Sequence, residues 1–136
     1  MGTWAVDAFG NDTSADWAWE LEKAADISLV EKALDTAISA NSDYLGAPEA
    51  MEALAAAEVI ARLQGNWGER SSYSDPVDKW VEANAFIPTG GLIAKAHQVL
   101  ELVVGPNSEL NELWQESSDH EAWLASVAEL KSRVQA

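Results

Sequence analysis

The chain has 136 residues, of which 8 are basic and 23 acidic, so its formal charge is −15, and 48% of its residues are hydrophobic. This charge excludes nucleic acids and anionic membrane surfaces as expected partners, because both attract clustered Lys and Arg. It favours a basic protein partner or divalent cations, and in the alternative interpretation it only keeps the protein soluble. The sequence contains no Cys, which excludes disulfides and thiolate metal sites, and no apolar run approaches the roughly 20 residues that span a bilayer.

Length and composition predict a single domain that spans residues 1–136. A chain of this size buries roughly 68% of its unfolded surface, which is enough for one hydrophobic core. The first residues lack the basic and apolar regions of a secretory signal, so we expect a cytoplasmic location.

Helix-start signals and the helical spacing of apolar residues predict three helices in the first half of the chain. They lie at about 13–25, 28–41 and 48–64. Thr13 is expected to cap the first helix, and Ser28 with Glu31 has the spacing of a capping box for the second. Pro48 suits the first turn of the third helix, and Gly65 suits a left-handed residue at its end.

The third predicted helix is rich in alanine between Ala50 and Ala61. Small side chains let neighbouring helices approach closely, so we expect this helix near the centre of the molecule. Glu58 and Arg62 lie four residues apart and are expected to pair on its exposed side.

A polar loop over residues 65–74 separates this half from four further helices. These helices are predicted at about 75–87, 92–104, 108–117 and 118–134. Ser108 is expected to begin the short one, and Ser118 with Glu121 forms a second capping box. The predicted fold class is therefore all-α: an irregular single-domain bundle of six or seven helices with a short irregular N-terminal segment.

Short motifs along the chain are more specific than the helix pattern. Those near the start are Met1-Gly2-Thr3-Trp4, Phe9, Asn11-Asp12 and Asp16-Trp17; those further on are Ala56–Ala61, Ser108-Glu109-Leu110, Leu113-Trp114 and Trp123 with Leu130. Together they resemble bacterial proteins that carry domain of unknown function 4259. The resemblance covers most of the chain and implies a common fold and a bacterial origin, but no activity. Ala5 and Gly10 depart from the residues that this family often has.

The candidate binding residues lie before and within the first predicted helix. They are Trp4, Phe9, Asp12 and Trp19. Polar and aromatic side chains before a helix can line a small site beside its free backbone N–H groups. In the alternative interpretation, Trp4 and Phe9 attach the chain's start to the core while Asp12 or Thr13 caps the helix.

Trp17 and Trp19 cannot share one narrow helix face, because residues two apart point in different directions. One of them is therefore expected to be exposed or to be covered by the N-terminal segment. An exposed Trp would be a suitable anchor at a protein interface.

A metal site is the alternative use of the many carboxylates. Glu49 with Glu52, and Glu109 with Glu112, have the i, i+3 spacing that places two carboxylates on one helix face, where they can share Mg²⁺. With 23 acidic residues such pairs also arise by chance. No catalytic triad, P-loop or zinc-binding motif is present in the sequence, and the preferred interpretation has no metal and no cofactor.

The sequence leaves three functions open. The preferred one is a protein-interaction module, immunity- or antitoxin-like, that binds a basic partner through an acidic surface. The second is a metal-dependent hydrolase of phosphate esters or nucleotides that uses the four glutamates. The third is a self-associating subunit, so that a homodimer is an alternative. We expect binding rather than catalysis.

Overall fold

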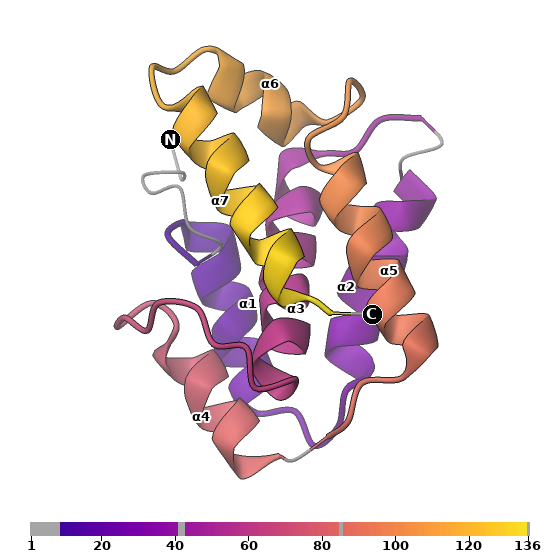
Figure 1. The fold of residues 1–136 in the computed structure, drawn as a ribbon, viewed down its shortest axis with the longest axis vertical. Coiled ribbons are helices and arrows are strands. Elements are labelled where there is room, and N and C mark those ends of the chain that lie inside the picture. The colour runs from indigo at the N-terminus through magenta and orange to yellow at the C-terminus, as the bar shows by residue number, and fades with distance from the viewer. Residues whose placement is uncertain (1–8, 41–42, 85, 136) are drawn as a thin grey trace.

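The computed structural model describes residues 9–40, 43–84 and 86–135, and these contain seven α-helices and no sheet. The helices are α1 (Asp12–Glu22), α2 (Ser28–Ala40), α3 (Ala47–Leu63), α4 (Asp75–Ala83), α5 (Gly90–Leu102), α6 (Glu109–Gln115) and α7 (His120–Arg133) (Figure 1). The predicted all-α bundle is confirmed. Within the described part of the chain, no helix is both long enough and apolar enough to cross a membrane.

Helix α3 is the centre of the bundle and packs against each of the other six helices. In Figure 1 α1 and α4 lie on one side of it, α2 and α5 on the other, and α7 in front. Nearly all of its side chains are buried, among them the alanines at positions 50, 53, 55, 56, 57 and 61. The central position predicted from its alanine content is therefore confirmed, because methyl side chains let six neighbours come close to one helix axis.

The buried hydrophobic side chains form one cluster to which every helix contributes. Leu45 connects two distant parts of this cluster, because its backbone N–H donates to the carbonyl of Asn107 and its carbonyl accepts from the N–H of Glu109. This short parallel bridge between Leu45 and Ser108 holds the start of α6 beside the start of α3.

Helix α1 begins earlier than its sequence signals predict. Asn11 has an extended backbone and caps the helix, with its Oδ1 accepting from the N–H of Ser14 at 2.7 Å. Asp12 and Thr13 already lie inside the first turn, so the prediction that one of them is the cap is wrong. Asn and Thr are both good caps, and the choice between them depends on where the chain turns into the helix.

Two predicted capping boxes do not form. Ser28 donates through its N–H and its Oγ to Asp26, at 3.0 and 2.6 Å, instead of accepting from the helix. Helix α7 begins after Asp119, and no side chain caps it.

Two other boundary predictions are confirmed. Gly65 has a φ of 86°, and Ser108 accepts from the N–H of Asn111 at 3.3 Å.

Candidate functional site

The structure separates the candidate residues near the start of the chain. Trp4 lies outside the described residues. Phe9 is 3% exposed and belongs to the hydrophobic core. Asp12 and Trp19 are exposed on α1, and Trp19 keeps 57% of its surface in contact with solvent. Phe9 therefore has a structural role in the core, and Asp12 and Trp19 are the predicted residues that a partner can reach.

Helix geometry places these two residues on one face of α1. At 3.6 residues per turn, positions 12, 16, 19 and 23 fall in a single stripe, and position 20 lies beside it. All five side chains at these positions are exposed, whereas the buried ones lie on the opposite face. We call Asp12, Asp16, Trp19 and Glu20 the acidic α1 face.

The three carboxylates of the acidic α1 face, Asp12, Asp16 and Glu20, form no ion pairs with other described residues. The bases near this face are Lys23, which follows it on the same stripe, and Lys32, which lines a hollow together with Glu20. Trp17, two positions before Trp19, is 3% exposed. The prediction that these two Trp residues differ in exposure is confirmed.

Three of the four glutamates of the metal hypothesis lie around the start of α3, and the fourth, Glu52, lies apart from them. Glu109 accepts a hydrogen bond at 2.7 Å from the N–H of Ala47, in the first turn of α3, and Glu112 accepts one from the Tyr44 hydroxyl. Glu49 lies in that same first turn of α3.

Glu52 lies elsewhere, in a hollow of about 230 Å³ that it lines together with Trp17 and Glu20. Burial raises its pKa, and the nearby charges of Glu20 and Glu49 raise it further. Among the described residues, no three His, Asp or Glu side chains are placed to hold one metal ion.

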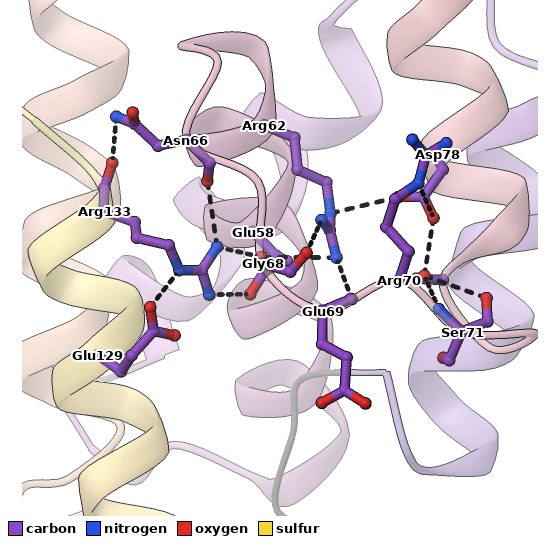
Figure 2. Close-up of polar contacts among 11 residues, drawn as sticks. Glu58, Arg62, Asn66, Gly68, Glu69, Arg70, Ser71, Asp78, Glu129 and Arg133 are labelled. Atoms are coloured by element: carbon purple, nitrogen blue, oxygen red, sulfur yellow. Dashed lines mark hydrogen bonds and ion pairs between the residues drawn. The ribbon is translucent and has the colours of Figure 1, made fainter.

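A cluster of charges around the buried side chains of Glu58, Arg62 and Asp78 was not predicted from the sequence. All three arginines of the chain, Arg62, Arg70 and Arg133, meet here around Glu58 and Asp78 (Figure 2). Arg62 lies 3.7 Å from Glu58 and 3.5 Å from Asp78, and Arg70 lies 3.4 Å from Asp78. We call these five residues the arginine cluster.

The expected pairing of Glu58 with Arg62 forms, but its predicted exposure is wrong. Glu58 is 5% exposed and Arg62 is 2% exposed. The reason is that α7 and the 65–74 loop cover this side of α3, and both bring charged partners with them. The i, i+4 spacing of Glu58 and Arg62 cannot predict that Arg133, 75 positions after Glu58, packs over them.

The Arg62 guanidinium is enclosed on all sides. The ring centroids of Phe9 and Trp67 lie 5.6 and 5.4 Å from its central carbon. Its Nη atoms donate to the backbone carbonyls of Gly68 and Glu69 at 3.4 and 3.0 Å. Burial lowers the pKa of Arg62, and the neighbouring carboxylates oppose that effect. The group therefore attaches the 65–74 loop and Phe9 to α3.

A cleft of about 440 Å³ lies beside the arginine cluster, between α3 and α7. Its apolar lining includes Phe9, Leu54, Val127 and Leu130, and its charged lining includes Glu58, Arg62, Glu69, Glu129 and Arg133. We call it the α3–α7 cleft. The one sequence signal that could have revealed it is the rarity of arginine in so acidic a chain, since two of the three arginines, Arg62 and Arg133, line it.

Comparison with known protein families found one match. The model of the family described as a domain of unknown function, DUF4259, matches residues 2–126, which include α1 to α6 and the first half of α7. Comparison with curated proteins and with solved structures found no match. The matched range contains the acidic α1 face and most of the arginine cluster, although Arg133 lies beyond it. The chain therefore belongs to the DUF4259 family.

Proposed function

We propose that this protein is an interaction module that binds a basic protein through the acidic α1 face. The observation that carries the proposal is the exposure of Trp19, which is 57%, within a stripe of carboxylates that have no ion-pair partner among the described residues. An exposed Trp between unpaired charges of one sign offers an apolar anchor together with an electrostatic preference.

The overall charge supports the same partner. At −15, the protein attracts basic proteins over distances set by the ionic strength, and this attraction accelerates their encounter. The local charges of Asp12, Asp16 and Glu20 would then orient the partner over Trp19. Binding of this kind weakens as salt is added.

A cytoplasmic location in a bacterial cell and an immunity- or antitoxin-like role belong to the same proposal. They are supported by the composition of the chain and by its resemblance to bacterial proteins. A basic toxin or enzyme would be a partner of the required charge.

The experiment is affinity capture from a bacterial lysate at low and moderate salt, followed by binding measurements on the captured protein. We expect a basic, salt-sensitive partner whose affinity falls about tenfold or more with Trp19→Ala, as for an interface anchor. Asp16→Asn should weaken binding less than Trp19→Ala and should reduce the dependence on salt.

The matched control is Glu116→Gln, which also removes one negative charge but lies at the end of α6. Equal losses for Asp16→Asn and Glu116→Gln would mean that total charge, and not the acidic α1 face, governs binding. A partner whose affinity is unchanged by Trp19→Ala would refute the proposal. Light scattering at two protein concentrations detects self-association, which would indicate the homodimer instead.

A further inference from the structure

The α3–α7 cleft has the size of a small-molecule site, and its lining combines apolar and charged side chains. Its volume of about 440 Å³ lies within the range of roughly 300–1,000 Å³ that ligand pockets span. Three separate segments of the chain contribute buried apolar side chains to it: Phe9, Leu54, Val127 and Leu130. An apolar ligand body would therefore leave water when it enters the cleft.

Both guanidinium groups beside the cleft are already engaged by the protein. Arg133 donates from Nε to Glu129 and from Nη1 and Nη2 to Glu58, at distances of 2.6, 2.6 and 3.0 Å. The Nη atoms of Arg62 donate to two backbone carbonyls, and its Nε, which forms no hydrogen bond, faces Asp78 at 3.5 Å. The rings of Phe9 and Trp67 also lie close to this guanidinium. An anionic ligand would have to displace these partners before it could bind an arginine.

The charge that remains available at the cleft is negative. Glu69 is exposed, and its carboxylate forms no ion pair with another described residue. Figure 2 shows this carboxylate pointing away from Arg62, which bonds to the backbone oxygen of Glu69 instead. The side chain of Glu129 is 59% exposed, and its Oε2 accepts from Arg133. No other described residue donates to its Oε1, which leaves a second acceptor at the cleft.

We propose that the α3–α7 cleft binds a small amphipathic amine. Its apolar body packs against Phe9, Val127 and Leu130, and its ammonium group donates to Glu69 and Glu129 at the rim. A carboxylate of the same shape is rejected, because it meets the unpaired charge of Glu69 while both arginines remain occupied. This site is independent of the acidic α1 face, because none of its lining residues lies on that face.

Phenethylamine and 3-phenylpropionate test the charge preference, since they share a ring and a two-carbon linker and differ in the charged group. Each is titrated into the full chain while the methyl resonances of Val127 and Leu130 are followed by NMR. We expect saturable shifts with phenethylamine and binding about fivefold or more tighter than that of 3-phenylpropionate. Ethylamine, which carries the charge alone, should leave the methyl resonances unshifted.

Two pairs of variants test the location. Ala125→Trp places a large side chain at the exposed rim of the cleft, whereas Ala128→Trp makes the same change on α7 outside the lining. Glu69→Gln removes the unpaired carboxylate, and Glu116→Gln removes one charge elsewhere. Far-UV circular dichroism verifies that each variant is folded.

We expect Ala125→Trp to abolish the phenethylamine shifts and Glu69→Gln to weaken binding about threefold to fivefold, while the two control variants bind as the wild type does. Equal binding of 3-phenylpropionate, an absence of shifts with phenethylamine, or identical behaviour of Glu69→Gln and Glu116→Gln would overturn the proposal.

Discussion

Arg133 and Glu58 lie 75 positions apart in the sequence and form a two-pronged ion pair, with Nη1–Oε1 and Nη2–Oε2 distances of 2.6 and 3.0 Å. The pair joins α7, the last helix, to the central helix α3. Glu58 also faces Arg62 at 3.7 Å, so one buried carboxylate serves two guanidinium groups. This shared charge explains how Arg62 and Arg133 can be accommodated beside the hydrophobic core, whereas Arg70 is half exposed and pairs with Asp78 and Glu82.

Replacement of Glu58 tests that arrangement. We expect Glu58→Gln to lower the free energy of unfolding by about 3–5 kcal/mol, because two arginines lose a buried carboxylate partner. The control is Glu129→Gln, which also removes a partner of Arg133, from a side chain that is 59% exposed. That change should cost no more than about 1 kcal/mol. Urea unfolding measures both, and equal losses would contradict a special role for Glu58.

Alanine substitutions at Gly68 and Gly90 provide a second comparison of two variants. A Cβ on Gly68 would lie 2.8 Å from an Nη atom of Arg133, whose guanidinium is held by Glu58, whereas a Cβ on Gly90 would meet no atom within 4 Å. Gly68→Ala should therefore destabilise the fold by about 1–3 kcal/mol. Gly90→Ala, in the first turn of α5, should stabilise it by about 0.4–1 kcal/mol. Thermal unfolding of the two variants should shift in opposite directions.

Tyr44 should titrate at unusually high pH. Its hydroxyl donates to the Glu112 carboxylate, and this hydrogen bond is the main reason that its pKa is raised from 10.0 to about 12. The neutral phenol is thus favoured in the folded state. The stabilisation is complete below pH 10 and is lost as the pH rises towards 12.

Ultraviolet absorbance of phenolate, compared between wild type and Glu112→Gln, measures the Tyr44 pKa. The substitution should return it towards its ordinary value. An unchanged titration curve would show that the Glu112 contact does not control this group.

Replacing Trp17 or Trp19 by alanine should affect the stability of the fold very differently, although both residues lie on α1. Trp17 is 3% exposed and Trp19 is 57% exposed. Trp17→Ala should lower the free energy of unfolding by about 3–5 kcal/mol through the cavity that it leaves. Trp19→Ala should change it by no more than about 0.5 kcal/mol. Denaturant unfolding separates the two, and a large loss with Trp19→Ala would mean that its ring is held in the core.

Local signals in the sequence were sufficient to predict where most helices lie. Gly65 ends α3 in the left-handed conformation, and Ser108 caps α6, because each of these features depends on backbone within a few residues. The alanine content also predicted the central position of α3, because small side chains let neighbouring helices approach closely. The starts of α1, α2 and α7 differ from the caps that the sequence predicts, in turns that hold more than one polar residue.

The sequence by itself determined the helical content, the approximate helix boundaries and the strong negative charge. Only the tertiary structure decided that Glu58 and Arg62 are buried, that Phe9 packs over Arg62, and that the α3–α7 cleft exists. The physical reason is the separation along the sequence between the residues that interact. Helix caps and i, i+4 pairs form between residues that are close along the chain, whereas the burial of a charge depends on partners that other helices bring to it. Arg133 reaches Glu58 only because α7 packs against α3.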